Sequence, residues 1–84
     1  MDTTFLLAAR YDGAPLIDIN TVRRDQFSYM ALPTFIRRLE QGAIPLPVVR
    51  LSGSQKSSRM IPLIDLAHYI DAKMVRARAE ANRK

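Results

Sequence analysis

The stretch that decides the fold is residues 32–42, with the sequence LPTFIRRLEQG. Pro33 suits the first turn of a helix, because the N–H that proline lacks would have no partner there anyway. Gly42 suits the position after a helix, because glycine adopts the left-handed backbone conformation without a side-chain clash. We therefore predict a helix over residues 33–41.

The predicted helix has two chemically different faces. Apolar side chains recur at helical spacing along one face, and these are Leu32, Phe35, Ile36 and Leu39. Polar and cationic side chains occupy the opposite face at positions i, i+3, i+4 and i+7, and these are Thr34, Arg37, Arg38 and Gln41. Such a helix can bury one face in a core and offer the other to the phosphates and base edges of DNA.

A second helix is predicted just before this one. Residues 16–19 begin extended, and Asp18 or Asn20 can then cap a helix that runs to about Phe27. Residues 28–31 form a short joint between the two helices. This order is typical of a helix-turn-helix, in which the second helix enters the major groove.

A β-hairpin is predicted after the helix pair. Residues 44–51 alternate β-branched and other side chains, and their two prolines favour an edge strand. Residues 52–58 have turn chemistry, and residues 59–61 can return as the second strand. As a wing, this hairpin can lay hydroxyls, amides and cations against phosphates. Its candidate DNA contacts are Ser54, Gln55, Lys56 and Arg59.

Two further elements frame this arrangement. Residues 4–11 are either a strand or a short helix. A last helix is predicted from about Leu63, and its inner face consists of Leu66, Ile70, Met74 and Ala77. Residues 73–84 continue that helix as an alanine-rich, basic arm. The arm can contact phosphates, pack against a second protomer, or end as a solvated helix.

Composition limits the class of protein. A chain of 84 residues forms one domain, and its 48% hydrophobic and 25% charged residues are ordinary values for a globular protein. The chain has no cysteine, and its one histidine, His68, has no nucleophile or converging carboxylates at a recognisable spacing. We therefore expect a non-enzymatic protein without metal or cofactor. No apolar run is long enough for a membrane span, so we expect no membrane partner and a cytoplasmic location in a bacterial host.

Positive charge is concentrated in the second part of the chain. The net charge is +5 and the isoelectric point is about 10.2. Residues 1–28 contain three basic and four acidic residues, whereas residues 29–84 contain ten basic and four acidic residues. A segregated basic surface is typical of proteins that bind polyanions, so the charge favours a nucleic acid partner.

Together these elements predict an α+β, mainly α protein, namely a small winged helix-turn-helix. It would have two short helices, a β-hairpin wing and a long C-terminal helix. Residues 1–84 would form a single DNA-binding domain with a basic C-terminal helical arm over about residues 73–84. Two arginines on an exposed helix face more often belong to an ordinary solvated surface than to a DNA-binding site. Here the order of the elements favours sequence-specific binding of DNA. The expected partner is double-stranded DNA, bound by a homodimer, with host RNA polymerase as a further candidate partner.

Several short motifs occur in order along nearly the whole chain: Phe5-Leu6-Leu7 with Tyr11 and Gly13, residues 46–50 (LPVVR), Ser54-Gln55-Lys56 with Arg59, Asp65-Leu66-Ala67, and Tyr69-Ile70-Asp71-Ala72. In this order, from about Thr4 to Ala79, the chain resembles the pyocin activator protein PrtN family. The resemblance implies a small phage or prophage regulator that binds promoter DNA and activates transcription of bacteriocin or phage genes. The family tends to place Thr or Ser before the proline of the second helix, whereas Leu32 stands here. This departure leaves the start of that helix open.

Two other functions stay open from the sequence. An excisionase-like architectural protein has a similar small winged shape but bends attachment-site DNA. A phage protein that binds and inhibits a host protein would use the hydrophobic side of the arm, and its affinity would persist at high salt. DNA binding, in contrast, weakens steeply as salt rises, because neutralising phosphates releases counterions. The DNA target sequence, the direction of regulation and the oligomeric state also stay open.

Overall fold

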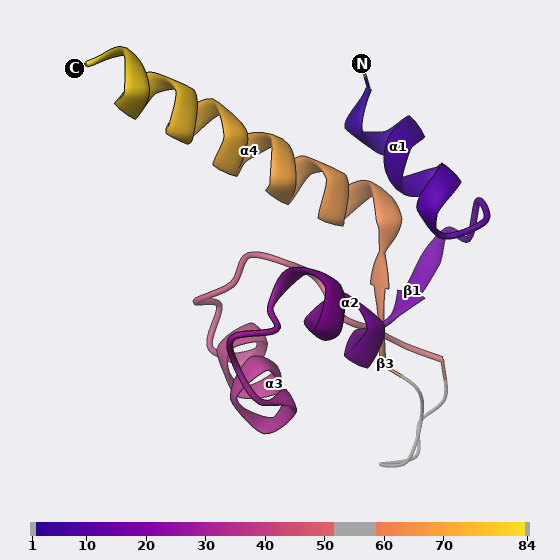
Figure 1. Ribbon diagram of the computed structural model, residues 1–84. Coiled ribbons are helices and arrows are strands. Elements are labelled where there is room, and N and C mark those ends of the chain that lie inside the picture. The colour runs from indigo at the N-terminus through magenta and orange to yellow at the C-terminus, as the bar shows by residue number, and fades with distance from the viewer. Residues whose placement is uncertain (1, 52–58, 84) are drawn as a thin grey trace.

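The computed structural model describes residues 2–51 and 59–83 (Figure 1). In chain order its elements are α1 (Thr3–Arg10), β1 (Leu16–Asp18), α2 (Ile19–Gln26), α3 (Leu32–Glu40), β2 (Val49–Arg50), β3 (Arg59–Pro62) and α4 (Leu63–Asn82). The predicted α+β, mainly α class is confirmed, and a third short helix, α1, precedes the predicted pair. No helix in these ranges is long and apolar enough to cross a membrane.

The N-terminal segment, which the sequence left as a strand or a short helix, is the helix α1. The Asp2 carboxylate caps it by accepting a hydrogen bond from the Thr4 N–H at 3.0 Å. α1 packs along α4. Leu7 is buried, and the Thr3 hydroxyl donates a hydrogen bond to the Asp71 carboxylate of α4. A capped end and a buried face therefore stabilise a helix that is short on its own.

The strands form one antiparallel sheet with the order β1-β3-β2. β3 is central, because it pairs Ile61 with Ile17 of β1 and Arg59 with Arg50 of β2. Ile17 and Ile61 are buried, so this part of the sheet faces the core. The edge position predicted for the strand after α3 is confirmed.

The predicted strand over residues 44–51 is wrong in its extent, because only Val49–Arg50 pair as a strand. The two prolines in this segment lack the N–H groups that a strand ladder needs. The residues before the strand contribute to the core instead, since Ile44 and Leu46 are only 6% and 5% exposed.

An aromatic cluster lies inside the core. The ring of Phe27 stacks on that of Phe35 at 4.8 Å between centroids and packs against that of Tyr69 at 5.6 Å. Phe27 follows α2, Phe35 belongs to α3 and Tyr69 to α4, so the cluster joins three helices. The largest fully buried side chains are Phe27, Phe35, Ile61, Leu66 and Val22.

α4 is the long C-terminal helix that the sequence predicts, with 20 residues. Leu66 is buried, and Ile70 packs against the core. Met74 is half-buried, and residues 75–83 are all exposed. Ala77 is exposed but lines a hollow with Ile70 and Met74, so it lies on the predicted face of α4, beyond the edge of the core. Residues 75–83 are termed the arm below.

Phe35→Ala removes a fully buried, stacked ring, and it should lower the free energy of unfolding by about 3–5 kcal/mol. Urea unfolding followed by circular dichroism measures this loss. Leu51→Ala is the matched control, because Leu51 is 62% exposed and surface substitutions usually change stability by less than about 0.5 kcal/mol. Equal losses in the two variants would contradict the assigned core.

Candidate nucleic-acid interface

α3 begins without a side-chain cap. Its N-cap residue is Ala31, and no side chain accepts from the first N–H groups. Leu32 is the first helical residue, and Pro33 lies in the first turn as predicted. The helix is held by packing, because Phe35 and Leu39 are buried on its apolar face.

α3 ends at a left-handed glycine, as predicted. Gly42 has a φ of 76°. The N–H groups of Ala43 and Ile44 donate to the Arg38 carbonyl at 3.0 and 3.3 Å, which satisfies one of the unpaired carbonyls of the helix end. Since Ile44 then enters the core, the C-terminal end of α3 is fixed in place.

The predicted DNA-binding face of α3 is largely open to solvent. Arg37, Arg38 and Gln41 are exposed, and Thr34 is half-buried. Within residues 2–51 and 59–83, neither guanidinium makes a hydrogen bond or an ion pair with another side chain. No described side chain therefore engages the donors of either arginine.

An open hollow of about 530 Å³ lies between α3 and the sheet. Arg37 lines it from α3, Gln41 from the C-cap position of α3, and Arg59 from β3. Three of the predicted contact residues thus meet at one hollow. Thr34 and Arg38 are not among the residues that line it, because they lie on the other flank of α3.

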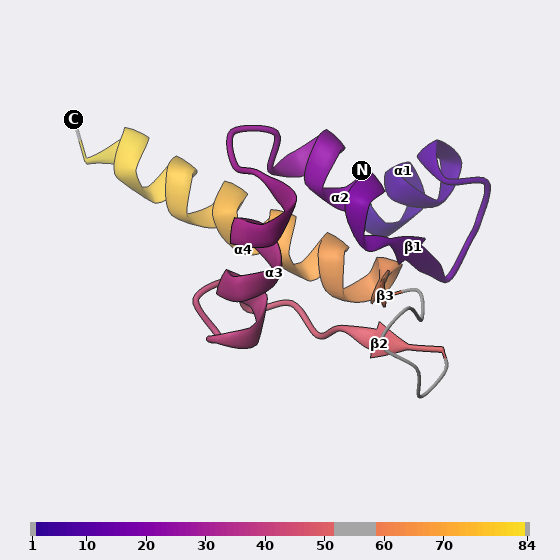
Figure 2. The same cartoon turned by 90° about the horizontal axis from the view of Figure 1, so that it is seen from below.

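A second hollow, of about 310 Å³, adjoins the first and shares Ile36, Glu40 and Arg59 with it. It adds Arg50, which pairs with Arg59 across the sheet. Figure 2 shows α3 and β2 joined by the segment of residues 41–48, and α3, this segment and β2 all contribute residues to the second hollow. Sequence reasoning missed Arg50, although the predicted hairpin already implied two cations on facing strands. It also missed Glu40, the one acidic residue of the described ranges that lines these two hollows.

The structure describes the two strands of the predicted wing, β2 and β3. β2 and β3 pair antiparallel, as the strands of a hairpin do. Arg59 is the first residue of β3. The other three predicted wing contacts, Ser54, Gln55 and Lys56, lie outside the described residues.

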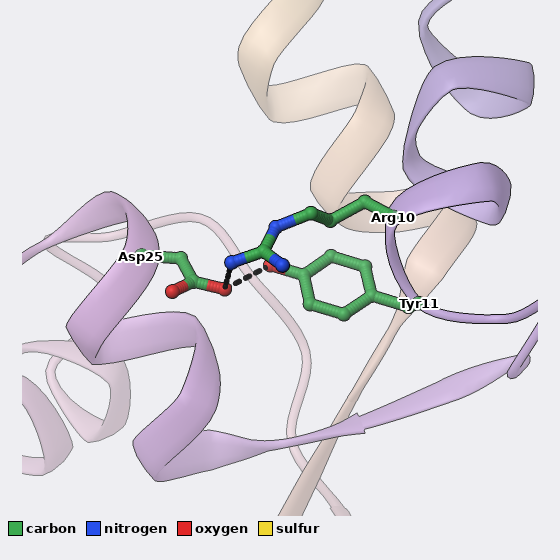
Figure 3. A network of polar contacts seen from close by, with 3 residues as sticks. All are labelled: Arg10, Tyr11 and Asp25. Carbon is green, nitrogen blue, oxygen red and sulfur yellow. Dashed lines mark hydrogen bonds and ion pairs between the residues drawn. The ribbon is translucent and has the colours of Figure 1, made fainter.

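A polar network fixes α1 to α2 (Figure 3). One oxygen of the Asp25 carboxylate accepts from the Tyr11 hydroxyl at 2.7 Å and lies 3.4 Å from the Arg10 guanidinium. Burial, and then the hydrogen bond to the Asp25 carboxylate, raises the pKa of Tyr11 to about 12. The network makes α2 a fixed support for α3.

Arg23 holds the turn between α2 and α3. Its Nη1 donates to the Met30 carbonyl at 3.1 Å, and its Nε donates to the Asn20 side-chain oxygen at 3.1 Å. Because these donors are engaged inside the protein, Arg23 has a structural role, unlike Arg37 and Arg38.

Comparison with known protein families gives a match over most of the chain. The family model described as pyocin activator protein PrtN matches residues 3–77, a span that runs from the start of α1 into the arm. No curated protein and no solved structure matches the chain. The description of the family is that of an activator, which agrees with the resemblance carried by the short motifs.

Tyr11→Phe tests the network, because it removes the hydroxyl that donates to Asp25. At pH 8 the variant should lose about 1 kcal/mol of unfolding free energy, the usual net worth of one hydrogen bond. In the wild type this contribution is present below about pH 10 and is lost as the pH rises towards about 12, because the folded state favours the neutral phenol. Urea unfolding near pH 10 and near pH 12 should show that the difference in unfolding free energy between the wild type and Tyr11→Phe becomes smaller as the pH rises. A gap that stays constant would contradict the assignment.

Proposed function

The chain belongs to the pyocin activator protein PrtN family, and on this premise we propose that it is a sequence-specific DNA-binding regulator that activates phage or prophage genes. The family is one of pyocin and phage activators, and DNA binding is the means of activation proposed here. The observation that carries the proposal is the exposed cationic face of α3, where Arg37 and Arg38 have no partner among the described side chains.

The proposed architecture is a winged helix-turn-helix. In its support, α2 and α3 follow each other through the short turn at residues 27–31. β2 and β3 then pair in a sheet with the order β1-β3-β2. In helix-turn-helix proteins the second helix lies in the major groove, and this is the place proposed for α3. The β2–β3 hairpin would lie beside it as the wing.

The proposed recognition residues lie on two flanks of α3. Arg37 and Gln41, which line the first hollow, are proposed to contact base edges. An arginine that binds guanine with two hydrogen bonds contributes roughly 1–3 kcal/mol of discrimination. Arg38 and Thr34, on the other flank, are proposed to contact the backbone and so set the position of the helix in the groove.

The wing strands supply the proposed phosphate contacts. Arg50 and Arg59 lie next to each other on β2 and β3, beside α3. The Glu40 carboxylate at the same hollows would repel a phosphate, so it favours a docked position in which it accepts from the amino group of cytosine. Three further wing contacts are proposed, namely Ser54, Gln55 and Lys56.

Residues 1–84 are proposed to act as a single DNA-binding domain within a homodimer. Two copies of α3 on one duplex would read half-sites about one helical turn, or roughly 34–36 Å, apart. Activation also requires contact with the transcription machinery, and host RNA polymerase is the proposed second partner.

Arg37→Ala should weaken binding to the preferred sequence. The probe is a duplex that the wild-type protein selects from a random-sequence pool, and fluorescence anisotropy measures its Kd. The Kd should rise about 5- to 150-fold, with a smaller change for unselected duplex. Arg83→Ala removes an equal charge at the far end of α4 and should keep the sequence preference. An unchanged Kd for a folded Arg37→Ala protein would contradict the proposal that Arg37 of α3 contacts the bases.

Arg50→Ala should weaken binding to selected and unselected duplexes alike, because a phosphate contact carries no sequence information. The slope of log Kd against log salt concentration should fall by about 1, as expected for the loss of one phosphate contact. Anisotropy titrations over a series of salt concentrations measure this slope. A loss confined to the selected duplex would instead place Arg50 at a base.

A further inference from the structure

Four of the six large apolar side chains that are exposed among the described residues belong to α1 and α4. Figure 1 shows α1 and α4 together on one side, with α3 on the other. Phe5 and Leu6 of α1 are 67% and 48% exposed, and Ile64 and Val75 of α4 are 58% and 63% exposed. Phe5 and Leu6, together with residues 75–83, are termed the α1–arm surface.

The molecule exposes more surface than a compact monomer of its mass. Its accessible surface is 5981 Å², whereas a folded monomer of 9.5 kDa exposes roughly 5,000 Å². The excess of roughly 900 Å² is close to the share of about 800 Å² that each partner contributes to a standard protein–protein interface. The radius of gyration, 14.0 Å, likewise exceeds the roughly 12 Å of a compact domain of this length.

The rest of the described chain leaves most of the arm uncovered, although Arg76 and Ala77 at its start line hollows beside other segments. Residues 75–83 are all exposed, and isolated helices shorter than about 12–15 residues are marginal in water. A covering surface would therefore stabilise the arm. Val75 and Ala79, four positions apart, share one face of the arm and are the apolar side chains that this face offers for burial.

We propose that a second copy of this chain covers the arm, so that the arm of each copy lies on α1 of the other in a twofold dimer. The charges of the two elements favour this pairing. The arm carries Arg76, Arg78 and Arg83 against Glu80, whereas α1 and its flanks carry Asp2 and Asp12 against Arg10. Two arms side by side would therefore repel, whereas an arm and an α1 helix attract each other.

The inference rests on the proposed function and deepens it, because this dimer leaves both α3 helices uncovered for one duplex. In Figure 1, α1 and the arm lie on one side of the molecule and α3 on the other. Self-association is measured without DNA, so the dimer and the DNA-binding role can fail separately. A monomer that still binds the selected duplex would refute the dimer alone, and a dimer that ignores DNA would refute the function alone.

Sedimentation equilibrium of the full chain at micromolar concentration tests the dimer. The wild type should have twice the monomer mass of 9.5 kDa. Leu6→Glu and Val75→Glu each place a charge on the α1–arm surface, and each should raise the dimer Kd at least about 30-fold. Leu51→Glu is the matched control, because Leu51 is 62% exposed and follows β2, outside α1 and α4. Circular dichroism checks that all three variants fold.

Mixing the two interface variants tests which elements meet. In a mixed dimer of Leu6→Glu and Val75→Glu, one of the two arm–α1 contacts carries both charges and the other carries neither. The mixture should therefore associate more tightly than either variant alone. A monomeric wild type, a dimer that Leu6→Glu leaves intact, or equal weakening by Leu51→Glu would each overturn the proposal.

Discussion

The stack of Phe27 on Phe35 is the contact on which the rest of the structure depends. α3 has no side-chain cap at its start, so it is held by what it buries, and Phe35 lies 4.8 Å from Phe27, centroid to centroid. Tyr69 of α4 packs against the same Phe27 ring. Because this cluster joins three helices, it fixes the rotation of α3 about its own axis. That rotation leaves Arg37 and Arg38 on the outside, so the packing of the core determines which cations face solvent.

The register of the strands in the sheet positions the remaining cations of the proposed site. β3 lies between β1 and β2, and this register sets Arg50 directly opposite Arg59 beside α3. Like charges gathered in this way repel one another, and a polyanion relieves the repulsion. Among the described residues, Glu40 is the one acidic residue at the two hollows. Its carboxylate repels a phosphate and can accept a hydrogen bond from an amino group. The cationic face of α3 was predictable from helical spacing, whereas the place of Arg50 depends on strand pairing.

Local signals were enough to predict much of the fold. Pro33 and Gly42 bracket α3 as expected, because a helix start and a helix end depend on a few neighbouring residues. Pairing between distant segments was not predictable in this way. β1 has three residues, and its ladder with β3 joins Leu16 to Pro62. The strand expected over residues 44–51 was too long, because an alternating pattern also describes an irregular segment that buries every second side chain.

Two sides of the molecule carry the two proposals: the cationic side formed by α3, β2 and β3 is proposed to bind DNA, and the side formed by α1 and the arm is proposed to bind a second copy. The central claim is that the first of these sides meets the DNA duplex. Amide chemical shifts of the isotope-labelled full chain, titrated with its selected duplex, test this claim most directly. The account predicts that the largest changes occur at Arg37, Gln41 and Arg59. Changes centred on the arm, with α3 unaffected, would contradict it.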